Sequence, residues 1–231
     1  STRMLAEDLK PNRLEAAKDV AAEFINGRPN DNIGITLFAG ETFTQCPLTV
    51  DHAVLLDMIH NIKCGLIEDG TAVGMGVANA VTRLKDSKAK SKVIILLTDG
   101  TNNKGDISPL TAAEIAKSFG IRVYTIGVGT NGMAPYPYPV GNTVQYINMP
   151  VEIDEKTLTQ IAGTTDGNYF RATSNSKLKE VYEEIDKLEK TKLNVKEYSK
   201  REEDYRWFAL AAFLCVLLEV LLRNSILKKI P

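Results

Sequence analysis

Two loops of the chain carry hard oxygen donors, and these side chains have the clearest potential for chemistry. Asp99 comes shortly after the apolar run 93–97 (VIILL) and opens the polar segment DGTNNKG, while Thr71 closes the loop EDGT. Carboxylate and hydroxyl oxygens suit Mg²⁺ or Mn²⁺, with waters or a ligand's carboxylate completing an octahedron. Each residue also has a local interpretation: Asp99 as a turn residue bonded to its own backbone, and Thr71 as the N-cap of a helix.

The sequence lacks the patterns that are typical of nucleic-acid-binding proteins, nucleotide-binding proteins and enzymes. The chain has 28 basic and 29 acidic residues, a net charge of −1 and no basic block, which argues against nucleic-acid binding. Gly74 and Gly76 imitate part of a dinucleotide motif, but they fall inside a helical pattern, and no P-loop lysine motif occurs, so no nucleotide is expected. No nucleophile and base are indicated, which favours a binding protein over an enzyme.

Strand-like and helix-like segments alternate along the first 190 residues. Apolar residues at helical spacing predict helices at 14–25, 51–62, 71–84, 108–119, 155–162 and 176–188, and apolar runs predict strands at 33–39, around 43, and at 93–97, 123–128 and 169–171. Pro11 fits the first turn of the first helix, and Gly74 and Gly76 permit close approach to a sheet. The pattern predicts a doubly wound α/β domain with a mainly parallel sheet, helices on both faces, and a ligand edge at the carboxyl ends of the strands.

The two loops resemble the metal-ion-dependent adhesion site of the von Willebrand factor A (vWA) domain. That family combines an Asp-x-Ser-x-Ser loop after the first strand, a threonine loop, and an aspartate after the fourth strand. Asp99 in LLTDG matches the aspartate, Thr71 in DGTAVGMGVANA the threonine, and Ser1 the first serine. The resemblance covers residues 1–190 and implies Ser1, Thr71 and Asp99 as ligands of Mg²⁺ or Mn²⁺. It also implies that the first strand and its aspartate are missing from this chain, which we therefore expect to be a fragment.

Arg3 stands where the second serine of that motif is expected. A guanidinium repels a divalent cation and cannot be a ligand, so either its side chain points away or the site binds metal weakly or not at all. Two functions follow. In the first, a partner's acidic side chain completes the ligand shell of the metal. In the second, the domain is a metal-free scaffold of a membrane complex and Arg3 replaces the cation.

The C-terminal segment predicts a membrane anchor. Residues 207–227 begin WFALAAFLCVLLEVLL and would span about 31 Å as a helix, close to the ~30 Å hydrocarbon core of a bilayer. Glu219 and Arg223 can pair near its end, and residues 228–231 form a short basic tail. The charged segment 191–206 is expected to be a juxtamembrane stalk. Basic residues beside a membrane span favour the cytoplasmic side, so the tail is expected to be cytoplasmic and the folded domain to lie outside the cytoplasm.

Three further segments point to a narrower group within the vWA family. They are MLAEDLKPNRLEAAK, the Tyr/Pro insert before VEIDEKTL, and the ending LLRNSILKKIP. These segments resemble the membrane-anchored vWA proteins of bacterial aerotolerance (Bat) operons, BatA type. The resemblance implies an inner-membrane protein with a periplasmic vWA domain that associates with sister Bat proteins and MoxR-type AAA+ ATPases. The insert 129–150 contains Tyr136 and Tyr138, and it is either a surface for a partner or a strand-and-turn cover over the sheet edge.

Overall fold

The computed structural model describes residues 1–141, 143–199 and 205–225, in two units, Ser1–Leu188 and Glu189–Pro231. A 3₁₀ turn, η1 (Thr2–Leu5), opens the chain. The α-helices are α1 (Arg13–Asn26), α2 (His52–His60), α3 (Val73–Leu84), α4 (Pro109–Ser118), α5 (Glu155–Thr164), α6 (Asn175–Ser199) and α7 (Tyr205–Ser225). The strands are β1 (Ile33–Phe38), β2 (Thr42–Thr49), β3 (Lys92–Thr98), β4 (Ile121–Val128), β5 (Met133–Val140), β6 (Thr143–Pro150) and β7 (Tyr169–Ala172).

The centre of the first unit is a parallel sheet in the order β3-β4-β7. β3 pairs with β4 along its whole length, from Lys92 opposite Ile121 to Thr98 opposite Gly127. β1 and β2 form a separate antiparallel hairpin, and so do β5 and β6. The predicted parallel α/β sheet is confirmed, and both hairpins lie outside it in the part of the chain that the structure describes.

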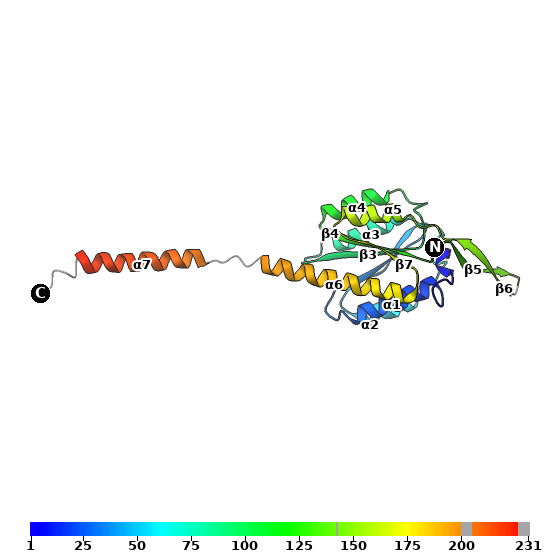
Figure 1. Ribbon diagram of the computed structural model, residues 1–231, viewed down its shortest axis with the longest axis horizontal. Helices are drawn as coiled ribbons and strands as arrows, with labels where there is room; N and C mark the ends of the chain where they lie inside the picture. Colours follow the sequence, from blue (N-terminus) through cyan, green and yellow to red (C-terminus); the bar gives the residue numbers. More distant parts are fainter. Residues whose placement is uncertain (142, 200–204, 226–231) are drawn as a thin grey trace. The chain divides into compact units, whose positions relative to one another are not determined.

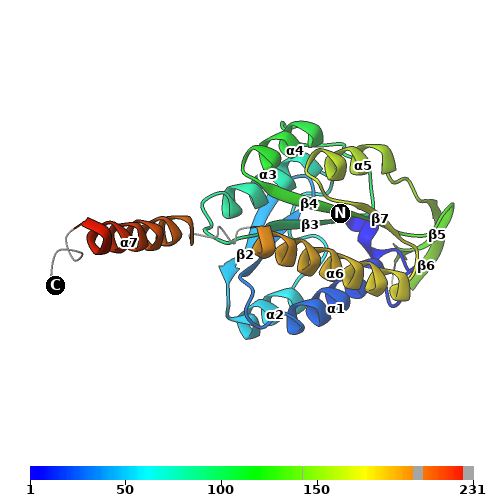
Figure 2. The same cartoon turned by 60° about the vertical axis from the view of Figure 1, so that its left-hand side comes forward.

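Helices cover this sheet on both faces (Figures 1 and 2): α3, α4 and α5 lie on one, and α1, α2 and the first part of α6 on the other. One apolar cluster packs α3, α4 and α5 against β3 and β4. A second packs α1 and α6 against β4 and β7, with Tyr124 and Ile126 fully buried. β4 therefore contributes side chains to both clusters, which explains why all but one of its positions are buried.

Capping side chains set the helix starts that bear on the site. The Asn12 side chain accepts a hydrogen bond from the Glu15 N–H at 2.9 Å, so α1 begins at Arg13. The prediction that Pro11 lies in the first helical turn is wrong, because Pro11 precedes this cap. Asp51 and Ser108 cap α2 and α4 at the predicted places.

Two glycines of α3 allow close approach, but at different neighbours. A Cβ on Gly76 would lie 2.9 Å from the Phe38 ring of β1, which agrees with the predicted approach to a strand. A Cβ on Gly74 would lie 2.0 Å from the Ile107 carbonyl oxygen, so this glycine accommodates the loop before α4 instead.

Within the described ranges of the second unit, α7 covers most of the predicted membrane span. Across residues 1–141, 143–199 and 205–225, the structure has no helix that combines the length and apolarity needed to cross a bilayer. Helix α6 extends to Ser199, into the predicted stalk. Residues 200–204 of the stalk, 226–227 of the predicted span and the tail 228–231 lie outside the described residues.

Candidate functional site

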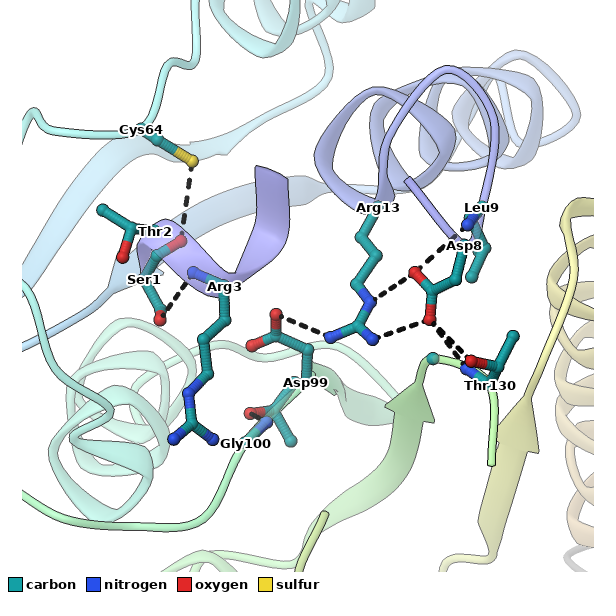
Figure 3. Close-up of polar contacts among 12 residues, drawn as sticks. Ser1, Thr2, Arg3, Asp8, Leu9, Arg13, Cys64, Asp99, Gly100 and Thr130 are labelled. Atoms are coloured by element: carbon teal, nitrogen blue, oxygen red, sulfur yellow. Dashed lines mark hydrogen bonds and ion pairs between the residues drawn. The ribbon is translucent and has the colours of Figure 1, made fainter. Parts of the chain in front are cut away.

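The candidate site lies where β3 ends and the chain turns out of the sheet. Asp99 is the first residue after β3, and the η1 segment, the start of α1 and the loop before α3 meet around it. Figure 3 shows Asp99 between the side chains of Arg3 and Arg13. The carboxyl end of the strand therefore brings together residues from four separate stretches of the sequence.

Asp99 is a buried carboxylate held by an arginine. The side chain is 3% exposed, and Arg13 Nη1 donates to its Oδ2 atom at 3.3 Å. Burial raises the pKa of Asp99, and the positive charge of Arg13 opposes this effect without cancelling it. The interpretation of Asp99 as a self-capping turn residue is wrong, because the Gly100 N–H pairs with the Thr98 hydroxyl and the carboxylate faces Arg13.

Asp8 is the second and stronger partner of Arg13. Arg13 Nε and Nη2 donate to the two oxygens of Asp8 at 2.7 and 2.6 Å, in the forked geometry typical of arginine. The Thr130 N–H adds a bond to Asp8 Oδ2 at 2.8 Å. Burial by itself would raise the pKa of Asp8, but the bonds from Arg13 and Thr130 lower it. Arg13 thus links α1, the segment before it and the β3 end in one buried network.

Thr71 lies beside this network in a loop fixed to the segment after β3. Its N–H donates to Asn103 Oδ1 at 2.8 Å, and its carbonyl oxygen accepts from the Asn103 N–H at 3.0 Å. The hydroxyl oxygen lies 3.4 Å from the point where a Cβ on Gly100 would stand. The interpretation of Thr71 as an N-cap is wrong, because the N-cap of α3 is Ala72, without a side-chain hydrogen bond.

Ser1 and Arg3 belong to η1. The Ser1 hydroxyl oxygen accepts from the Arg3 N–H at 3.3 Å. The guanidinium of Arg3 does not point away from the site: its Nη1 lies 3.7 Å from the same Cβ point of Gly100 that Thr71 approaches. Arg3 is 40% exposed and its Nη2 lies 4.0 Å from a Glu152 oxygen, so it remains accessible from outside.

Neighbouring bonds hold η1 in place. The N–H and hydroxyl of Thr2 donate to the two oxygens of Asp69 at 2.8 and 2.7 Å. Asp69 lies in the same EDGT loop, two residues before Thr71, so these bonds join η1 directly to that loop. Burial would raise the pKa of Asp69, and the Thr2 hydrogen bonds lower it.

Ser1, Thr71 and Asp99, the predicted ligands, thus come from three segments to one edge, but their surroundings do not fit a divalent cation. Arg13 already holds one oxygen of Asp99, and the Arg3 guanidinium stands beside the Thr71 hydroxyl. Arg13 thus competes with a metal ion for the Asp99 carboxylate, and the positive charge of Arg3 repels a further cation in this space. Among the described residues, no three His, Cys, Asp or Glu side chains form a metal-binding group.

Tyr136 and Tyr138, the predicted partner residues, lie elsewhere. They are on β5, and the hairpin is anchored by the Glu7 N–H, which donates to the Pro135 carbonyl oxygen at 2.9 Å. β6 is exposed at every position that its strand spans, whereas Ala134 on β5 is buried. The Tyr146 hydroxyl of β6 donates to Glu7 Oε1 at 2.8 Å.

Asp8 and Arg13 are site residues that were not predicted from the sequence. Both lie in MLAEDLKPNRLEAAK, which carried the resemblance to the Bat proteins but no chemical role. The available signal was an acid and a base on either side of Pro11, close to the motif position of Ser1. The contact of Arg13 with Asp99 spans 86 positions, so no local pattern reveals it.

Comparisons with known proteins agree with this geometry. The family model of the von Willebrand factor type A domain matches residues 1–184. The crystal structure of BatB from Bacteroides thetaiotaomicron is 34% identical, covers 82% of this chain and 95% of its own, and superposes with a TM-score of 0.71. An aerotolerance-related membrane protein from Bacteroides fragilis is 30% identical, with 81% and 92% covered and a TM-score of 0.70.

Two more distant matches show the limits of the likeness. A Borreliella burgdorferi protein is 26% identical over 95% of this chain, which spans 64% of that longer protein. A mussel byssus matrix protein was solved with zinc in its metal-ion-dependent adhesion site (MIDAS) motif. It is 24% identical to this chain with a TM-score of 0.60, which shows a similarity of fold alone.

The match over most of the chain and the two Bacteroides structures lead to the same assignment. The named relative is a BatB, so the BatA type stays a prediction. The chain belongs to the von Willebrand factor type A family, among the Bat aerotolerance-related membrane proteins.

Proposed function

We propose that this chain is a membrane-anchored protein-binding module that holds a partner at the β3 edge without a resident metal ion. The observation that carries the proposal is the position of the two arginines. Arg13 is bonded to the buried Asp8 and Asp99, and Arg3 presents a half-exposed guanidinium close to Gly100, which the Thr71 hydroxyl also approaches. The edge therefore offers a fixed positive charge to an acidic side chain of a partner, and Arg3 takes the role that a cation would have.

The anchor is the segment 207–227. Its support is the apolar run that begins at Trp207, its length relative to a bilayer, and the description of the Bacteroides fragilis relative as a membrane protein. The basic tail 228–231 favours a cytoplasmic C-terminus and hence a periplasmic vWA domain at the inner membrane. Sister Bat proteins and a MoxR-type ATPase are the partner classes that the family resemblance implies, and the role is binding rather than catalysis.

Charge reversal at Arg3 tests the proposal. The full chain, purified in detergent, is used to capture the soluble domains of sister Bat proteins, with and without EDTA. We expect Arg3→Glu to reduce capture at least tenfold and EDTA to leave it unchanged. Lys117→Glu is the matched control, because Lys117 is an exposed lysine in the last turn of α4 and should have no effect.

The metal-dependent alternative has its own support. Ser1 and Asp99 lie at one edge (Figure 3), and the Thr71 hydroxyl oxygen is 3.4 Å from the Cβ point of Gly100, the residue after Asp99. Calorimetric titration of Mg²⁺ and Mn²⁺ into the same protein distinguishes the two. Saturable binding that Asp99→Ala removes, together with capture that EDTA abolishes, would contradict the metal-free proposal. Undiminished capture by Arg3→Glu would contradict the role given to Arg3.

A further inference from the structure

The β5–β6 hairpin is an apolar element without charge, and it stands apart from the rest of the surface. Residues 129–150 contain no Asp, Glu, Lys, Arg or His, in a chain that is 25% charged. Figure 1 shows the hairpin projecting from the body of its unit. Seven of its large apolar side chains are between 37 and 59% exposed: Met133, Tyr138, Val140, Val144, Tyr146, Ile147 and Met149.

The hairpin has one blocked edge and one open edge. Pro135, Pro137 and Pro139 occupy alternate positions of β5, opposite Asn148, Tyr146 and Val144 of β6. Because proline has no N–H, these three residue pairs are the non-hydrogen-bonded pairs of the β5–β6 ladder. In such pairs the backbone groups of both residues point away from the partner strand. The outer edge of β5 therefore presents no donors at the three prolines and cannot support a further strand.

The outer edge of β6 has the opposite character. The N–H and C=O groups of Val144, Tyr146 and Asn148 point away from β5, and within the described residues β6 is hydrogen-bonded to β5 alone. Every residue of β6 is exposed, so nothing in the folded unit covers these groups. An uncharged, exposed edge of this kind is a site for strand addition.

From this edge we infer that β6 pairs with β6 of a second copy of this chain, in a two-fold antiparallel arrangement. The spacing of the outward-facing residues suits pairing of two β6 strands. If Tyr146 lies opposite Tyr146 of the second copy, Val144 of each copy lies opposite Asn148 of the other. These three residues then meet outward-facing partners, while Pro150, the fourth outward position of β6 and the one without an N–H, lies at the end of the strand. The two hairpins form one four-stranded sheet. A charged edge would repel its copy, whereas this neutral one does not.

The amount of exposed apolar surface agrees with such a contact. Val144, Tyr146, Ile147 and Met149 of β6 are between 37 and 59% exposed, and pairing of two β6 strands brings these side chains beside those of the second copy. Glu7 fixes the base of the hairpin through Pro135 and Tyr146, so the strand is held in place before pairing. This surface is separate from the Arg3 edge, and the inference does not depend on the proposed function.

Light scattering of the full chain in detergent, over a range of concentrations, tests the inference. We expect a dimer for the wild-type chain and for Asn148→Thr, which keeps the outward N–H. Asn148→Pro removes that N–H but no bond to β5, and it should weaken dimerisation at least tenfold. Arg3→Glu should leave the dimer intact, which separates this result from the test of partner binding.

Oxidative cross-linking gives a second readout that does not depend on the proline variant folding. In a Cys64→Ser, Cys215→Ser background, with Cys46 retained because it is buried, Tyr146→Cys should form a disulfide-linked dimer. Tyr138→Cys is the matched control, since it is similarly exposed but lies on the blocked strand. A monomeric wild-type chain, an unaffected Asn148→Pro dimer, or equal cross-linking at both positions would overturn the inference.

Discussion

The β3 edge and the β5–β6 hairpin satisfy their polar groups in opposite ways. At the β3 edge, charged side chains are buried but bonded to each other: Arg13 lies between Asp8 and Asp99, and all three side chains are at most 3% exposed. The hairpin carries no charge and is exposed, and in the described part of the chain the outward-facing backbone groups of β6 pair with no strand. The first region balances charged groups against each other within the domain, whereas the second leaves backbone groups open to a further strand.

Removing Arg13 should have the largest effect. Arg13→Met leaves the buried carboxylates of Asp8 and Asp99 without their counter-charge, so we expect a loss of about 3–5 kcal/mol in the free energy of unfolding. This corresponds to a fall in Tm of roughly 10 °C for a domain of this size. Thermal unfolding followed by circular dichroism measures the change. Arg83→Met, at an exposed arginine bonded to the Thr44 hydroxyl, is the control and should change Tm little.

The two carboxylates should respond to pH in opposite directions. Because the pKa of Asp8 is lowered in the folded state, its stabilising contribution is present above the ordinary value of about 3.9 and is lost as the pH falls below it. The pKa of Asp99 is raised, so the unfolded state loses this proton first and Asp99 reduces stability as the pH rises above about 4.

Urea unfolding of Asp8→Asn and Asp99→Asn between pH 3 and 7 measures this difference. At pH 7 we expect Asp8→Asn to cost about 2–3 kcal/mol and Asp99→Asn about 1 kcal/mol, because Asp8 holds the forked bond. The cost of Asp8→Asn should shrink below pH 4, and that of Asp99→Asn should grow as the pH falls from 7 to 4. Parallel pH profiles for the two variants would contradict the division of roles between the carboxylates.

The same comparison explains what the sequence could and could not predict. The alternation of helices and strands, the caps at Asp51 and Ser108, and the position of Asp99 after β3 follow from local patterns. The Arg13–Asp99 contact does not, because it depends on how α1 docks on the sheet. The hairpin had a signal in the sequence, proline at every second position of β5, which marks an edge strand, but from this insert only a partner surface or a cover over the sheet edge was predicted.

The smallest expected effect concerns the contact between Glu7 and Tyr146, where the two regions meet. The Glu7 carboxylate accepts the Tyr146 hydroxyl bond and raises the pKa of this exposed tyrosine. In Glu7→Gln the charge is lost, so the pKa of Tyr146 should fall towards the ordinary value of about 10, with little change in Tm. NMR titration of ring-labelled tyrosine measures it, and Tyr146→Phe assigns the signal. The Glu7 N–H bond to Pro135 remains in this variant, so the hairpin should keep its register. An altered β5–β6 ladder would mean that the side chain of Glu7, and not its backbone, holds the hairpin to the domain.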